Sequence, residues 1–267
     1  MLRLFHVELY RNSRRVIVLA LLAVYLFLAL TGAFKFFGSD LYFEQMREMA
    51  RNRYADDTEK MIEECRFHCK QAYAYCLTEK HTALWFIPPG ILGIYLTIDQ
   101  RKRRVSEMVS SGNSRFSVFC AKSLCYALLC AVIPVFCGLL HFLLRPANYT
   151  GYFNAGDFGF FLYDAGYMLL YYFFSALMWL PMNYLCGEPV SGLITSFFCY
   201  VFLSGEISSL IPVQPEAEIE IGGWDTINYL TELASHEWGV RNLMIPVIGG
   251  MIAFLAAWLI FQRRPLK

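Results

Sequence analysis

Long uncharged apolar runs are the feature that most constrains this fold. The clearest covers residues 116–144, in which Lys122 is the one Asp, Glu, Lys or Arg. A bilayer core about 30 Å thick is crossed by roughly 20 apolar residues in a helix. Charged residues make up 17% of the chain, whereas soluble domains carry about 25%. The sequence therefore predicts an integral membrane protein.

The order of apolar and polar segments predicts an all-α membrane protein of six transmembrane helices in a single permease domain. The six expected spans are 16–37, 83–98, 116–144, 167–186, 190–210 and 243–261. We expect an amphipathic interfacial helix over 1–15. Residues 38–82 are expected to form a helical extracellular insertion, because the stretch 41–75 lacks Gly and Pro. Residues 99–115 then connect the second span to the third.

The distribution of cations predicts the orientation. In a six-span arrangement one side of the membrane carries most of them: Arg3, Arg11, Arg14, Arg15, the cluster 101–104, Arg115, Arg263, Arg264 and Lys267. Cytoplasmic loops carry the excess of Lys and Arg. We therefore expect a multi-pass protein of the cell membrane with both termini and residues 99–115 in the cytoplasm. The net charge of +1 gives no reason to expect nucleic acid as a partner.

Catalytic motifs are missing from the sequence. It has no G-x-x-x-x-G-K-[ST] phosphate loop, no G-x-S-x-G nucleophile pattern and no H-E-x-x-H pair. We expect a chain that is not an enzyme and that holds no cofactor or metal of its own. An ATP-driven role would need a separate subunit to bind ATP and magnesium.

Ionisable residues within or beside the expected spans lie near their ends. They are Lys35, Lys122, Asp164, Glu188 and Glu206. The simplest interpretation is interfacial anchoring, because a charge at mid-depth is costly. Their positions weigh against an ion-coupled carrier, which usually needs an ionisable group at mid-depth.

The insertion 38–82 contains the three outer cysteines among the nine of the chain. Cys65 and Cys69 are one helical turn apart, a poor geometry for a mutual disulfide, whereas Cys76 could pair with either if the chain turns back. A metal site with His68 is the alternative, although the spacing matches no strong template. The cysteines of span 116–144 are expected to be packing residues.

The segment 99–115 combines charge with a short amphipathic run. Four cations at 101–104 precede an apolar ridge formed by Val105, Met108 and Val109, and a Ser/Gly/Asn break follows at 110–113. One interpretation is a topology anchor on anionic lipid. A topology anchor requires only charge, however, and the apolar ridge is not needed for it. The alternative is therefore a docking segment for a partner protein.

These residues resemble the ABC-2 type permeases, the membrane subunits of one class of ABC exporter. The resemblance lies in Ile98-Asp99-Gln100-Arg101, Val105–Val109, Ser111–Arg115, Lys122 and Leu203-Ser204-Gly205 with Pro212. The family usually has Glu and Gly early in this loop, where this chain has Asp99 and the basic cluster. The long first outer loop is similar to that of sodium-efflux and peptide-antibiotic-resistance permeases.

The resemblance implies a permease subunit that exports an amphipathic or peptide-like substrate. It would pair with a second permease subunit and bind ABC ATPase subunits through 99–115, acting as a coupling helix. The contacts expected at that interface are Arg101, Arg103, Arg104, Val105, Met108, Val109 and Arg115. Two alternatives stay open. A membrane sensor or scaffold would bind a ligand through its outer loop and need no ATPase, and an ion-coupled carrier would depend on an ion gradient.

Overall fold

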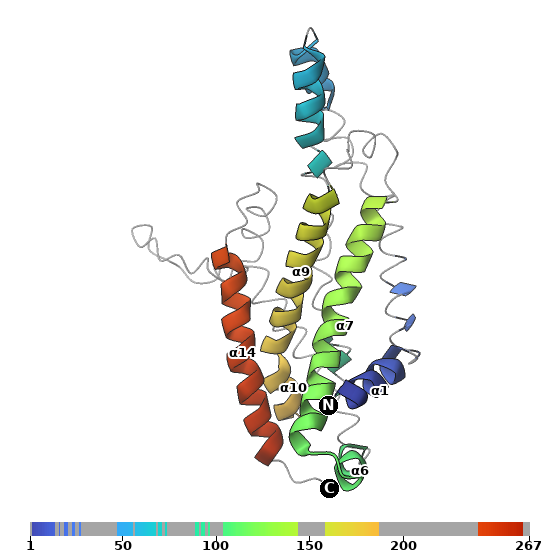
Figure 1. Cartoon of the computed structure of the whole chain (residues 1–267), viewed down its shortest axis with the longest axis vertical. Helices are drawn as coiled ribbons and strands as arrows, with labels where there is room; N and C mark the ends of the chain where they lie inside the picture. The colour runs from blue at the N-terminus through green and yellow to red at the C-terminus, as the bar shows by residue number, and fades with distance from the viewer. Residues whose placement is uncertain are drawn as a thin grey trace, which may run out of the picture.

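The computed structural model describes four continuous segments, 2–13, 104–143, 158–186 and 240–263, together with 47–55, 57–67 and isolated residues between 16 and 96. The labelled helices are α1 (Leu2–Ser13), α6 (Arg104–Ser110), α7 (Arg115–Leu143), α9 (Phe158–Met178), α10 (Leu180–Cys186) and α14 (Val240–Arg263) (Figure 1). Short turns join or end them, and no strand occurs in the described segments. The described part of the chain is therefore all-α, as predicted.

Three described helical segments are long and apolar enough to cross a membrane: Arg115–Leu140, Phe161–Leu185 and Pro246–Arg263. They stand side by side along the long axis of the molecule (Figure 1). The chain is therefore a membrane protein. The three segments overlap the predicted spans 116–144, 167–186 and 243–261. The predicted spans 16–37, 83–98 and 190–210 fall wholly or largely outside the described residues.

Helix α9 begins at Phe158, well before the predicted start of its span at 167. Aromatic packing explains the difference. The Tyr73 ring meets Phe161 and Phe142 edge to face, with ring centroids 4.6 and 4.9 Å apart. Its hydroxyl also donates a hydrogen bond to the Phe161 carbonyl at 2.9 Å. These contacts stabilise the helical turns that precede residue 167.

The lower part of this span is interrupted at Trp179. Pro181 has no N–H to donate within the helix, and the Trp179 N–H bonds to the Ala176 carbonyl three residues back at 3.3 Å. The chain then resumes as α10. The interruption separates α10 from α9 near the end of the molecule where α6 and α1 lie (Figure 1).

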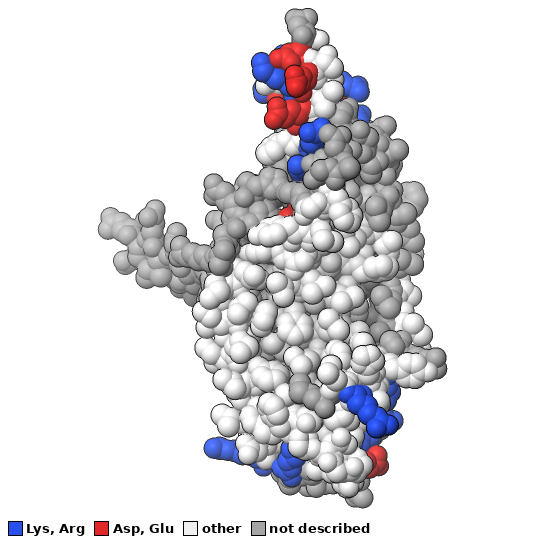
Figure 2. Space-filling view, viewed as in Figure 1, with Lys and Arg blue, Asp and Glu red and all other residues white. Residues whose placement is uncertain are grey.

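Helix α14 packs closely on α9 through glycine. A Cβ atom added at Gly250 would lie 2.5 Å from the Phe174 carbonyl oxygen, so a larger residue would force the helices apart. The opposite side of α14 exposes an apolar stripe: Met244, Ile248, Met251, Ile252, Leu255 and Leu259. In the view of Figure 2 an uncharged band separates two charged ends of the described surface. Both features suit a lipid environment.

The predicted insertion contains helix in its described part, at 47–53 and 58–67. It projects from the end opposite α6 (Figure 1). Asp57 caps the second helix by accepting a hydrogen bond from the Lys60 N–H at 3.2 Å, and its carboxylate lies 2.9 Å from Lys60 Nζ. The side-chain bond to Lys60 lowers the pKa of Asp57 below its ordinary value.

The turn from α6 to α7 is closely specified by local hydrogen bonds. The Gly112 N–H donates to the Val109 carbonyl, and the Asn113 N–H to the Met108 carbonyl. With Gly112 at a φ of +93°, these bonds form a Schellman motif, which ends helices at glycine. Ser114 then caps α7 by accepting a hydrogen bond from the Ser117 N–H at 3.1 Å. The predicted break at 110–113 is thus confirmed.

We expect Gly112→Ala to destabilise the protein by about 1–2 kcal/mol, because a side chain disfavours this left-handed backbone conformation. The space around the site is open, so the cost comes from the backbone rather than from a clash. Gly159→Ala is the matched control, since its Cβ would also meet nothing within 4 Å. Thermal unfolding in detergent should show a lower Tm for Gly112→Ala alone. An equal Tm for the two variants would contradict this account of the turn.

Candidate functional site

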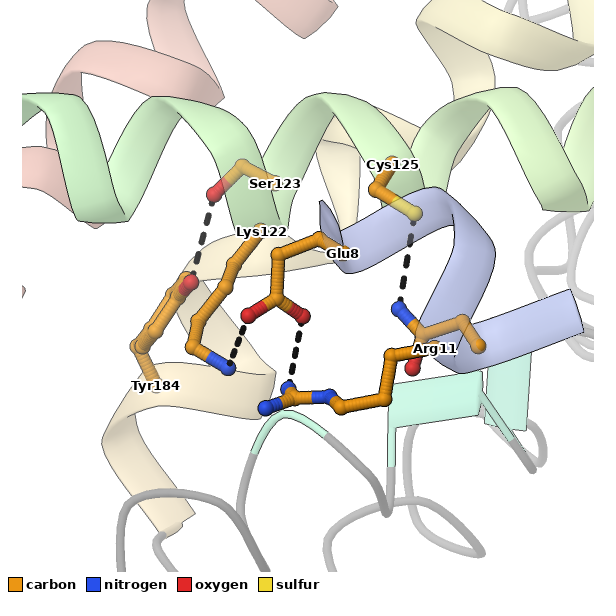
Figure 3. A network of polar contacts seen from close by, with 7 residues as sticks. Glu8, Arg11, Lys122, Ser123, Cys125 and Tyr184 are labelled. Atoms are coloured by element: carbon orange, nitrogen blue, oxygen red, sulfur yellow. Dashed lines mark hydrogen bonds and ion pairs between the residues drawn. The ribbon is translucent and has the colours of Figure 1, made fainter. Parts of the chain in front are cut away.

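A buried charge network joins the N-terminal helix to the central span. The Glu8 carboxylate of α1 lies between two cations (Figure 3), with Lys122 Nζ of α7 3.4 Å from Oε1 and Arg11 Nη2 2.7 Å from Oε2. The side chains of Glu8 and Lys122 are 1% and 3% exposed. The network therefore fixes α1 across α7 by charge pairing between buried side chains.

The pairing corrects the interpretation of Lys122 as an interfacial anchor. An anchoring lysine extends its ammonium group toward water, whereas this one is buried and meets a carboxylate from another helix. A lone charge at this depth would cost several kcal/mol, and only a close counter-charge offsets that cost. Arg11 completes the network with a side chain that is 28% exposed.

A small cavity adjoins the network. Its volume is about 20 Å³, and Glu8, Asn12, Lys122 and Tyr126 line it together with three leucines. Among the residues described, Glu8 Oε1 accepts no hydrogen bond of good geometry, although it pairs with Lys122. A cavity of this size and polarity can hold one water molecule. The Asn12 amide lies at its edge and donates to Cys125 Sγ at 3.4 Å.

A second polar chain links α7 to α10. The Asn183 amide donates to the Tyr126 hydroxyl at 3.3 Å, and that hydroxyl donates to the Pro89 carbonyl at 3.2 Å. A Cβ atom at Gly93 would lie 2.4 Å from Asn183 Oδ1, so glycine is needed where this amide approaches. The Ser123 and Tyr184 hydroxyls, 3.2 Å apart, join the same two helices (Figure 3).

The apolar ridge of α6 faces the interior of the chain. Val105 is 2% exposed and belongs to the apolar cluster that contains Phe119, Tyr184 and Phe261. Met108 and Val109 pack against this cluster and are half-buried. The outward side of α6 and its turn is polar, with Glu107, Ser110 and Ser111 exposed. In the described structure, the surface available to a partner is therefore this polar side rather than the ridge.

The arginines predicted to contact an ATPase do not form one cluster in the described structure. Arg115 is half-buried and its Nη1 donates to the Gln262 carbonyl at 3.1 Å, which ties the start of α7 to the end of α14. Arg104 lines a groove beside Arg11. Arg101 and Arg103 lie outside the described residues. Their assignment to a partner interface stays a prediction.

The outer cysteines and the buried acid of α9 lie toward the opposite end. Cys65 and Cys69 are buried, while Cys76 and His68 lie outside the described residues, so the disulfide and the metal alternative stay predictions. Within the described segments, no three His, Cys, Asp or Glu residues are grouped as metal ligands. Asp164 is 1% exposed, and its Oδ2 has no hydrogen-bond partner among the described residues.

Sequence reasoning did not identify Glu8, Tyr126 or Asn183 as site residues. The pairing of Glu8 could have been predicted, because Glu8 is the one acidic residue in 1–15 and Lys122 is the one lysine in the apolar span 116–144. Tyr126 and Asn183 carried no comparable signal, since single polar residues in apolar helices commonly serve packing.

These features define an α-helical membrane protein in which buried polar contacts join α1 to α7 and α7 to α10, and an apolar cluster joins α6 and α14 to the same end. Comparison with protein-family models finds none that matches the chain, and comparison with curated protein sequences finds no match.

We expect the Glu8→Met substitution to destabilise the protein by about 3–5 kcal/mol, because it leaves Lys122 buried without its counter-charge. The double variant Glu8→Met/Lys122→Met should be more stable than Glu8→Met, since replacing both members of a buried pair by apolar residues is often nearly neutral. Thermal unfolding in detergent measures both.

The pair of exposed Arg53 and half-buried Glu64, at 3.6 Å, supplies the control. Arg53→Gln should change stability by less than about 1 kcal/mol. The single variant Lys122→Met completes the double-mutant cycle. A loss in the double variant equal to the sum of the two single losses would contradict the pairing as the source of stability.

Proposed function

We propose that this chain is the membrane-spanning permease subunit of an ATP-driven ABC-2 type exporter. The observation that carries the proposal is the two-sided character of α6. One side of this seven-residue helix is buried among the ends of the spans, and the other side is polar and exposed. A helix with these two sides is suited to transmit force from a partner protein to the spans.

The packing around α6 supplies a route for that force. The Phe119 ring of α7 lies 5.4 Å from the Tyr184 ring of α10 and 5.0 Å from the Phe254 ring of α14, measured between centroids. Val105 belongs to the same cluster. Because close-packed side chains transmit displacement with little compression, a shift of α6 moves all three helices together.

Helix α1 has a supporting role in this mechanism. The Glu8–Lys122 pair holds α1 against α7 beside α6, so the three elements move as one body. Rigid-body movement of packed helices is a common basis of switching between two states. ATP-driven closure of the partner would thereby exchange inward-facing and outward-facing arrangements.

The remaining parts of the proposal follow from the resemblance and from the charge distribution. Two permease subunits pair in the cell membrane and bind ABC ATPase subunits, which hold the ATP and magnesium. Both termini and α6 lie in the cytoplasm, and the insertion 38–82 is extracellular. The cargo is amphipathic or peptide-like.

The proposal is tested by co-expressing the chain with candidate ATPase subunits and measuring copurification and ATP hydrolysis in reconstituted vesicles. Ser110→Arg places a large cation on the exposed side of α6. We expect it to weaken ATPase binding about tenfold, equivalent to about 1.4 kcal/mol, and to lower transport-coupled hydrolysis, with Tm unchanged.

Thr58→Arg adds the same charge at an exposed position of the outer helix and should change neither readout. Unchanged ATPase binding and hydrolysis in Ser110→Arg would show that α6 is not the coupling element. Activity of the purified chain without any ATPase subunit would favour the sensor or scaffold alternative.

Asp164 favours a second candidate function, an ion-coupled carrier. It lies one turn inside the candidate span Phe161–Leu185 and is buried, and Lys70 is near enough to act on its charge. Buried carboxylates in membrane spans often mark ion or proton pathways.

Under this alternative, Asp164→Asn should abolish transport that depends on a proton or sodium gradient. Uptake or efflux in vesicles with an imposed gradient and no ATP is the measurement. Transport that requires ATP and tolerates Asp164→Asn excludes this alternative.

A further inference from the structure

A groove between α1 and α6 has a charged lining. Its volume is about 620 Å³, and it is lined by Arg11, Arg104, Glu107, Met108 and Ser111. We propose that this groove binds the phosphate of an anionic phospholipid headgroup, seated between the guanidinium groups of Arg11 and Arg104.

The charges of the lining favour an anion. Two arginines and one glutamate give the lining a formal charge of +1. Guanidinium groups bind phosphate oxygens through planar pairs of N–H donors. The Ser111 hydroxyl donates to the Met108 carbonyl at 2.8 Å, so the two arginines supply the cationic donors of the site.

Arg11 is held in position before any ligand arrives. Its Nη2 donates to Glu8 Oε2 at 2.7 Å, and Glu8 is itself fixed by Lys122. Ordering a long side chain in advance removes part of the entropy cost of binding. The buried network therefore makes one wall of the groove a preorganised anion site.

The surroundings indicate a lipid rather than a small soluble anion. On α1, Leu2, Val7 and Tyr10 are 80%, 52% and 59% exposed, and the exposed Arg3 and His6 lie between them on the same face of the helix. Exposed apolar and basic side chains on one helix beside a cationic groove match the two parts of an anionic phospholipid, the acyl chains and the phosphate. Cations also gather at this end of the uncharged band (Figure 2), at the level where headgroups would lie.

The volume of the groove fits one headgroup. Its lining comes from α1, from α6 and from the turn that follows α6. A cavity of about 300–1,000 Å³ is the usual size for a small-molecule site. Lipid binding can be measured without the ATPase, because every lining residue belongs to this chain. Glu107 and Ser111 also belong to the polar side of α6 that the proposed function assigns to the ATPase.

The test measures lipid binding to the full-length chain purified in a neutral detergent, without any ATPase subunit. Phosphatidylglycerol is titrated and bound lipid is counted by native mass spectrometry. We expect Arg104→Gln to weaken binding about tenfold through loss of a charge-assisted contact. Glu107→Gln should strengthen binding several-fold by removing a repulsive charge from the lining.

Arg115→Gln is the matched control, because Arg115 lies near the same end but bonds to the Gln262 carbonyl and is not part of the groove. It should leave lipid binding unchanged. Tm measurements establish that each variant is folded. Equal losses in Arg104→Gln and Arg115→Gln would overturn the proposal, because they would indicate attraction by the overall charge.

Two further titrations identify the ligand. Inorganic phosphate at the same concentration should not displace phosphatidylglycerol, and phosphatidylcholine should bind more weakly because its headgroup has no net charge. Displacement by inorganic phosphate, or equal binding of phosphatidylcholine, would overturn the assignment to an anionic phospholipid.

Discussion

The buried pair of Glu8 and Lys122 is the constraint on which the described arrangement depends. A lysine with 3% of its side chain exposed inside an apolar helix requires a counter-charge, and α1 supplies it. Once α1 is fixed on α7, Arg11 and Asn12 take their places beside α6 and Cys125. Only one position of the N-terminal helix pairs the two buried charges, so the cost of leaving either one unpaired fixes that position.

The short helix α6 has two sides with different surroundings. Its apolar ridge is part of the chain's own core, so Val105 serves to join α6 to the spans rather than to contact a partner directly. Under the proposed function, contact with the ATPase would fall to the polar side of α6 and to neighbouring cations. This division suits a coupling element, because the same helix must be firmly attached on one side and accessible on the other.

Sequence predicted the features that follow from composition and local chemistry. The apolar span around Lys122, the end of α6 before Gly112 and the helical content of the insertion all follow from the length of apolar runs or from turn chemistry. Contacts between distant residues were not predictable in this way. The pairing of Glu8 with Lys122 and the earlier start of α9 at Phe158 depend on tertiary packing, which overrides local preference.

Arg11 connects the buried network to the proposed lipid site, and this connection has a thermodynamic consequence. Its guanidinium bonds to Glu8 and also lines the groove. A phosphate in the groove would stabilise the arrangement in which Arg11 faces both anions. Suppose that a ligand binds the protein more tightly when α1 is docked on α7 than when it is not. By linkage, it then favours the docked state by the difference between its two binding free energies. The membrane lipid would then influence the position of α1. Because α1 and α6 both pack against α7, it would also influence the position of α6.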